Sequence, residues 1–214
     1  MLSRTVHKSA WLFAAVVALG CMAWAQTAEV DTVVVPATHT LTITVKGTIG
    51  PLLSGSDPLS LDGVKGTVKI LASESLKPTK HTATSATYTL PAGAITVTAG
   101  SNKFSTESPS KMIINLTSTA DTLTLIIAAK VEGESLMVTD TTYLKAGSWT
   151  TAVLKHPGVF KPSPQKLTAA KTATGAGCKI KYTIFGTTSI LGFSGTASNS
   201  ATADPVLPEE SWDE

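Results

Sequence analysis

The chain has 214 residues, of which 17 are lysine or arginine, 15 are acidic and four are histidine. Only 15% of the residues are charged, 43% are hydrophobic and about one in six is threonine. This composition excludes a disordered polyelectrolyte, a collagen-like repeat, a coiled coil and a small disulfide-stapled scaffold. Because Thr and Val are branched at Cβ, they favour strands over helices, so we expect an all-β chain.

Residues 1–25 have the pattern of a secretory signal peptide. A short basic stretch is followed by an uncharged apolar run at residues 11–19 and by Ala23-Trp24-Ala25, which has the small residues of a cleavage site. The run is well short of the ~20 apolar residues that a spanning helix needs, and no longer run follows. We therefore expect export to the periplasm, the cell surface or the medium, without a membrane span after cleavage. The alternative is a lipoprotein signal ending at Cys21.

Cleavage after Ala25 changes the charge and the cysteine count. It removes Arg4, Lys8 and no acidic residue, which leaves 15 basic and 15 acidic side chains and no arginine. Because guanidinium groups bind phosphates in a bidentate manner, we expect no nucleic-acid partner. Cys178 is the only cysteine that remains, so it cannot close a disulfide within the chain. We expect a buried free thiol, or else a disulfide between two chains.

Apolar and polar residues alternate along most of the remaining chain. The clearest runs are residues 41–46, 64–70 and 179–184, where Thr and Lys occupy the polar face. Period-two patterning predicts strands rather than helices. Residues 122–131 form the best candidate for a central strand. Residues 33–35 are a candidate edge strand. A short helix is an alternative to strand structure only at residues 164–172. Further strands are expected at residues 84–90, 94–99, 111–117, 135–142, 149–154 and 187–195.

Turn-forming residues separate these runs, so the sequence predicts many short antiparallel strands. We expect a single immunoglobulin-like β-sandwich of about 8–10 strands within residues 26–197, with a sheet closed on itself as the alternative. Residues 198–214 lose the alternation and contain five acidic and no basic residues. They are expected to form an acidic, disordered tail, with folding back onto the lysine-rich body as the alternative.

The sequence contains no motif specific for catalysis. Two S-x-x-K matches, at residues 108–111 and 163–166, fall in loops that lead into strands rather than on a helix face. The acidic residues of the body are expected mostly in turns, which argues against a catalytic carboxylate pair. We predict no catalytic residue.

Metal and cofactor sites are not predicted either. The loop at residues 54–63 contains Asp57 and Asp62 but lacks the ligand spacing of an EF-hand. No histidine stands in a zinc-binding pair; after cleavage the histidines are His39, His81 and His156.

Two aromatic residues are candidate ligand platforms. Trp149 follows a Gly-Ser turn and Tyr143 precedes it, so both are candidates for a loop rim that binds sugars. The alternative for Trp149 is the core aromatic of a sandwich.

Several turn and strand-end segments resemble those of uncharacterised exported bacterial β-sandwich proteins. They are the loop at residues 56–63, the strand end at residues 86–91 and the run at residues 192–198. The resemblance implies a fold and a compartment but no site.

From these observations we expect an exported, non-enzymatic structural, adhesive or binding domain with a protein or glycan partner, whose contacts lie at strand edges and loop tips. Exposed edges would permit self-association. A carbohydrate-binding module is the first alternative. A secreted hydrolase, with a site assembled only by folding, is the second.

Overall fold

The computed structural model describes residues 39–203 except 105, 107 and 132, and it does not describe the side chains of Lys103 and Ala203. The predicted signal peptide, the candidate strand at residues 33–35 and the acidic residues 204–214 lie outside the described residues.

The described chain is all-β, as predicted. It contains one 3₁₀ turn and no α-helix, and in the described part no helix has the length and apolar character needed to cross a membrane. The elements are β1 (His39–Ser54), β2 (Lys65–Ser73), β3 (Lys80–His81), β4 (Ser85–Leu90), β5 (Ile95–Ala99), β6 (Asn102–Phe104), β7 (Ser110–Leu116), β8 (Ala120–Val131), β9 (Glu134–Lys145), η1 (Thr151–Leu154), β10 (Gln165–Leu167), β11 (Lys179–Ile184) and β12 (Thr187–Ala203).

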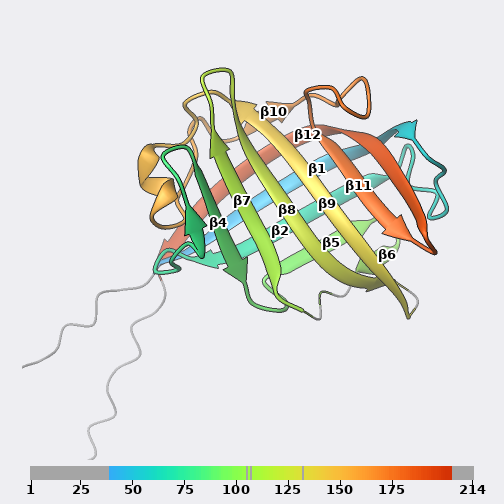
Figure 1. The fold of residues 1–214 in the computed structure, drawn as a ribbon, viewed down its shortest axis with the longest axis horizontal. Helices are drawn as coiled ribbons and strands as arrows, with labels where there is room; N and C mark the ends of the chain where they lie inside the picture. The colour runs from blue at the N-terminus through green and yellow to red at the C-terminus, as the bar shows by residue number, and fades with distance from the viewer. Residues whose placement is uncertain (1–38, 105, 107, 132, 204–214) are drawn as a thin grey trace, which may run out of the picture. The chain divides into compact units, whose positions relative to one another are not determined.

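All twelve strands belong to one antiparallel sheet. Eleven strands follow the order β3-β4-β7-β8-β9-β11-β12-β1-β2-β5-β6, and β10 pairs with β12 beside this path. In Figure 1 the sheet folds over, so that β4, β7, β8 and β9 lie in front of β1 and β2 and cross them steeply, while β11 lies beside the first part of β12. The hydrogen-bonded ladder is therefore continuous, with more strands than the sequence predicted.

The alternating pattern of the sequence explains how the core forms. In β8, which lies between β7 and β9, Leu123, Leu125 and Ile127 are buried, whereas Ile126 lies on the opposite face and is partly exposed. Inward-facing residues of every strand except β3 contribute to one hydrophobic cluster within the described residues. Thr and Lys cover the outer faces, so the apolar side chains of both halves of the sheet are removed from water together.

A row of glycines crosses the sheet where its longest strands meet. Gly195 of β12 pairs with Gly47 of β1, which in turn pairs with Gly66 of β2. A Cβ atom on Gly47 would overlap the carbonyl oxygen of Ser194, and one on Gly195 would overlap that of Lys46. Only glycine permits this close approach of the backbones, and glycines in strands allow a sheet to bend.

Two of the predicted elements differ from the structure. Residues 149–154 were expected as a strand, but the prediction is wrong, because Thr151–Leu154 form the 3₁₀ turn η1. This segment is held by two hydrogen bonds of Trp149 rather than by pairing with a neighbouring strand. The Trp149 backbone N–H donates to a carboxylate, and its indole N–H donates to a carbonyl oxygen. The body was expected to end at residue 197, yet β12 continues to Ala203. From Ser198 onward the residues of this strand are small or polar, so they leave no apolar alternation to detect.

Candidate functional site

A two-residue turn with an exposed aromatic ring joins β11 and β12. Ile184 pairs with Thr187, so the turn consists of Phe185 and Gly186, whose φ angles are 51° and 72°. Positive φ at both positions is the pattern of a type I′ hairpin, in which Asn-Gly is the preferred pair. A left-handed conformation costs a residue with a Cβ about 1–2 kcal/mol. The Phe185 side chain is also 66% exposed, more than any other large hydrophobic side chain in the described chain.

A shallow groove lies close to this turn on the outer face of the sheet. Thr183 of β11 pairs with Met137 of β9, and Met137 is 48% exposed. The groove has a volume of about 490 Å³, and its outward-facing lining includes Ser108, Ala128, Lys130, Ser135, Met137 and Thr183. In Figure 1 the tips of the β8–β9 and β11–β12 hairpins lie at the same end of the sheet. We call the surface formed by Phe185, Met137, Ala128 and Thr183 the hairpin end.

Trp149, one of the two predicted ligand platforms, lies inside the protein. Its side chain is only 4% exposed and packs edge-to-face on Phe160, with 5.7 Å between the ring centroids. The backbone N–H donates to Asp121 Oδ2 over 2.9 Å, and the indole N–H donates to the Gly158 carbonyl oxygen over 2.9 Å. A ring held in this way has no open face for a sugar, and its position corresponds to the core-aromatic alternative.

Tyr143 of β9 and Cys178, the residue before β11, are neighbours in the structure. Tyr143 is partly exposed and packs at the margin of the core, whereas Cys178 is a free thiol with no exposed surface. The Tyr143 backbone N–H donates to Cys178 Sγ over 3.2 Å. Burial raises the pKa of the Cys178 thiol to about 11. The thiol is therefore protonated at neutral pH and out of reach of a second chain in this conformation.

The β1–β2 loop, which contains the two aspartates considered for calcium, is held by hydrogen bonds of its own. Tyr182 Oη donates to Asp57 Oδ1 over 2.5 Å, and the Asp62 backbone N–H donates to Asp57 Oδ2 over 2.8 Å. Partial burial acts to raise the pKa of Asp57, but the bonds from Tyr182 and from the Leu61 and Asp62 backbones hold it below its ordinary value. Asp57 thus fastens the loop to β11. Among the described residues, no three His, Cys, Asp or Glu side chains gather as metal ligands would.

Two acidic residues lie in buried strands, where the sequence interpretation had placed the acids mostly in turns. Asp121 and Asp140 are each 1% exposed. Asp140 Oδ2 accepts a long hydrogen bond of 3.5 Å from the Thr142 hydroxyl, and Oδ1 has no hydrogen-bond partner in the described chain. Asp140 lines a small cavity of about 30 Å³ whose other lining residues include Ile49, Val138, Ile180, Tyr182 and Phe193. The lining contains no second acid and no histidine or serine.

The two S-x-x-K segments remain apart from one another and from any helix. Residues 108–111 lead into β7, and residues 163–166 lead into β10. Ser163 Oγ accepts a hydrogen bond of 3.0 Å from the Asn199 backbone N–H, which ties its loop to β12. This contact gives Ser163 a role in the fold.

Sequence reasoning missed the two features that stand out in the structure, although signals for both were present. The predicted strands at residues 179–184 and 187–195 leave only two residues between them, and this spacing indicates a primed turn in which a phenylalanine is out of place. The alternation through residues 136–144 likewise directs Asp140 inward. Comparison of the chain with protein-family models, with curated proteins and with solved structures finds no match.

Proposed function

We propose that this chain is an exported, non-enzymatic structural or adhesive domain whose molecules associate through the hairpin end. The observation that carries the proposal is Phe185, an aromatic side chain that is 66% exposed in a left-handed turn conformation. Both its exposure and its backbone conformation are unfavourable in an isolated molecule. Burying a phenylalanine side chain is worth roughly 1.5–3 kcal/mol, so contact with a second surface offsets both costs.

A second copy of the chain fits this surface because the hairpin end contains both a projecting ring and a groove. In a two-fold pair, the same patch is used on both molecules, so each Phe185 can pack beside the other molecule's Met137. Exposed charges of opposite sign lie close by: Glu134 stands at the tip of the β8–β9 hairpin, and Lys181 is two residues from Thr183 on β11. Such charges are complementary when the patch meets its own copy.

The strand edges, which were the expected route to self-association, are less suited to it than the hairpin end. The sheet begins with β3, which has two residues, and ends with β6, which has three. Very short edge strands, with lysine in the sequence of each, are a common protection against strand addition. Association through the hairpin end requires no free edge.

Sedimentation velocity over a range of concentrations tests the proposal. The purified protein should form dimers or larger species as its concentration rises, and Phe185→Asn should shift this association to at least tenfold higher concentration. Asn suits a type I′ turn, so the variant should fold at least as stably as the wild type. Val159→Asn is the matched control, because Val159 is a 40%-exposed hydrophobic residue on a separate loop. A wild type that stays monomeric, or equal effects of both substitutions, would contradict the proposal.

The other expectations receive less support. A carbohydrate-binding module was expected to use Trp149 or Tyr143 as its aromatic platform, and Trp149 is only 4% exposed. A hydrolase needs converging catalytic groups, whereas the cavity beside Asp140 contains a single acid. We retain as proposals the immunoglobulin-like sandwich arrangement, supported by two halves of one sheet packing on a common core, and export, supported by residues 1–25.

A further inference from the structure

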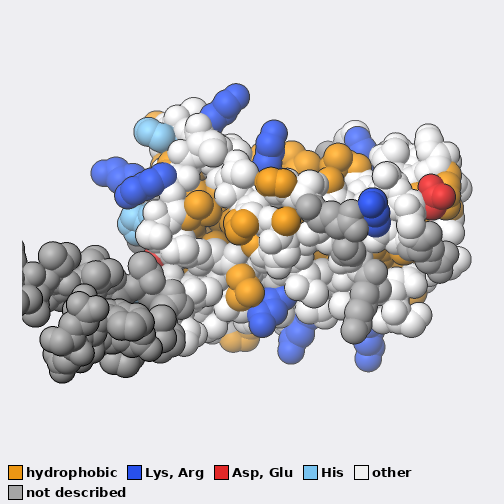
Figure 2. Space-filling model, turned by 90° about the horizontal axis from the view of Figure 1, so that it is seen from below, with side chains coloured by type: hydrophobic (Ala, Val, Ile, Leu, Met, Phe, Trp, Pro, Cys, Tyr) orange, Lys and Arg blue, Asp and Glu red, His pale blue; other side chains and the backbone are white. Residues whose placement is uncertain are grey.

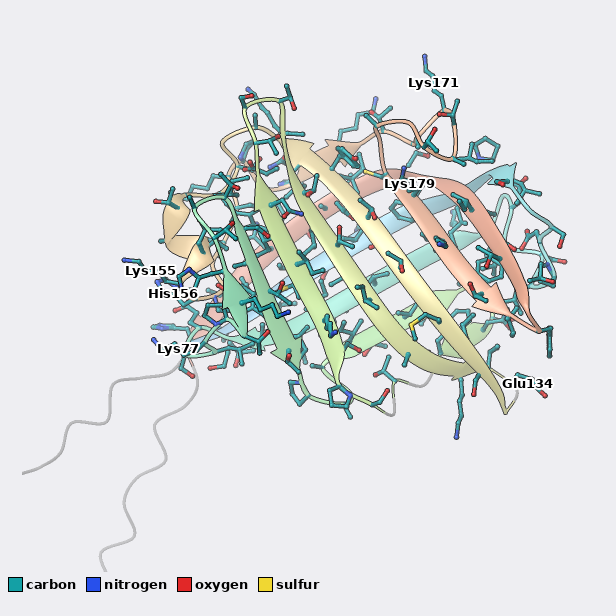
Figure 3. The ribbon with its side chains drawn as sticks, viewed as in Figure 1. Lys77, Glu134, Lys155, His156, Lys171 and Lys179 are labelled. Carbon is teal, nitrogen blue, oxygen red and sulfur yellow. The ribbon has the colours of Figure 1, made fainter. Side chains whose placement is uncertain are left out.

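One end of the sheet has a surface of basic side chains, separate from the hairpin end. Residues 75–106 and 141–203 contain no acidic residue. The exposed basic side chains that these segments place around β3 and η1 are Lys77, Lys80, His81, Lys155, His156 and Lys161, which we call the basic end. In Figure 3, Lys77, Lys155 and His156 project at the left, and Glu134 lies at the right. In Figure 2 lysine and histidine side chains also gather at the left end.

Strand pairing and one hydrogen bond bring the parts of the basic end together. Lys80 and His81 form β3, which pairs with β4. Tyr88 of β4 donates its hydroxyl hydrogen to the Val153 carbonyl oxygen of η1 over 2.5 Å. Lys155 and His156 directly follow η1. Glu74, at the margin of this surface, is engaged by His39, whose Nδ1 lies 3.4 Å from Glu74 Oε2.

The described chain ends beside this surface. Ala203, the last described residue, pairs with His39, and the His39 carbonyl oxygen accepts a 2.9 Å hydrogen bond from Glu74 N–H, three residues before Lys77. Asn199 Nδ2 donates to the Phe160 carbonyl oxygen over 3.0 Å, next to Lys161. The described part of β12 therefore contacts the segments that lead to Lys77 and to Lys161.

We propose that the acidic segment, residues 204–214, docks on the basic end of its own molecule. The segment contributes five carboxylates and no basic group, namely Asp204, Glu209, Glu210, Asp213 and Glu214. Eleven residues can span up to about 36–40 Å, which is ample for a surface that begins within a few residues of Ala203. The short connection gives the segment a high effective concentration at this surface. Docked there, it competes with any external polyanion for the same lysines.

Zero-length carbodiimide cross-linking of the full chain at low salt, read by peptide mass spectrometry, tests where the segment lies. Cross-links from Glu209, Glu210, Asp213 and Glu214 should favour Lys77, Lys80, Lys155 and Lys161 at least fivefold over Lys69. Lys69 is the matched control, because it is exposed on the outer face of β2. It lies across β1 from Ser198 of β12, and Ser198 is only five residues before Ala203. The preference should disappear at 1 M NaCl, where charges are screened beyond about 3 Å.

An even distribution of cross-links between Lys69 and the basic end would overturn the proposal. Mixing ¹⁴N- and ¹⁵N-labelled protein identifies cross-links between two molecules. The proposal would also be overturned if all cross-links between the acidic segment and the basic end joined two molecules. Neither result depends on Phe185, so the docking and the self-association are tested independently.

A second experiment measures competition with an external anion. Binding of inorganic polyphosphate to the full chain should become at least tenfold tighter in the variant Glu209→Gln/Glu210→Gln/Asp213→Asn/Glu214→Gln, because the basic end is then uncovered. Adding Lys155→Gln and Lys161→Gln to that variant should remove most of the gain. If the neutralised variant binds polyphosphate no more tightly than the wild type, the segment does not cover the basic end.

Discussion

The carboxyl group of Asp140 lies between the two halves of the sheet, with one oxygen that receives no hydrogen bond from the described residues. Burial raises its pKa to about 7, against a weaker opposite effect of the Thr142 hydroxyl. The folded protein thus keeps a proton on Asp140 at pH values where the unfolded chain has lost it. The contribution of Asp140 to the free energy of unfolding therefore decreases as the pH rises from about 4 to about 7, and it stays at its lowest value above that range.

Replacing Asp140 by Asn should remove this pH dependence. Relative to the wild type, Asp140→Asn should gain ~2–4 kcal/mol of stability between pH 4 and pH 8, because the amide has no charged form to bury. Urea unfolding of both proteins at pH 4, 6 and 8 measures the difference, in which the titration of all other groups cancels. Parallel stability profiles for the two proteins would mean that Asp140 is not the group responsible.

At the scale of the strands, the glycine row sets how closely β12, β1 and β2 approach. Gly195→Ala should destabilise the protein by ~1–3 kcal/mol or more, because the added methyl group meets the Lys46 carbonyl oxygen rather than a flexible side chain. Gly158→Ala is the control, since no atom lies within 4 Å of its added Cβ, and it should change stability by less than ~0.5 kcal/mol. Thermal unfolding compares the two. A similar small effect at both positions would show that the strands separate easily at the row.

The strands that could be predicted from sequence are those that bury a row of apolar side chains on one face. The runs around Leu41, Leu125 and Ile180 are of this kind. β3, β6 and β10 have only two or three residues each, too few for an alternation to appear. The segment after Trp149 has strand-forming residues, yet side-chain hydrogen bonds from distant positions determine its conformation. Such contacts are properties of the folded chain and are not visible in a local pattern.

The same reasoning applies to the candidate site. The sequence indicated loop tips as contact surfaces, but it identified Trp149, which packing on Phe160 removes from the surface. Phe185 acquires its significance from a backbone conformation and an exposure that exist only once β11 and β12 have paired.

On the scale of the whole molecule, one ladder and one core cluster connect the described strands. We therefore expect a single cooperative unfolding transition. Near-ultraviolet circular dichroism, which reports the packing of rings such as Trp149 and Phe160, should follow the same urea curve as the far-ultraviolet signal of the sheet. Two separated transitions would mean that part of the sheet folds independently of the rest.

The pairing of β1 with β12 also fixes an order of events. β1 is the first described strand and β12 the last, and they pair from His39 with Ala203 to Ser54 with Ile190. While the chain is being made, β1 can find β2, but its other side has no native partner until the final strand is available. Contacts between such distant parts of a chain form slowly. The closing step of folding is thereby postponed until β12 has been synthesised, which keeps the chain in an open form suited to the export that we propose.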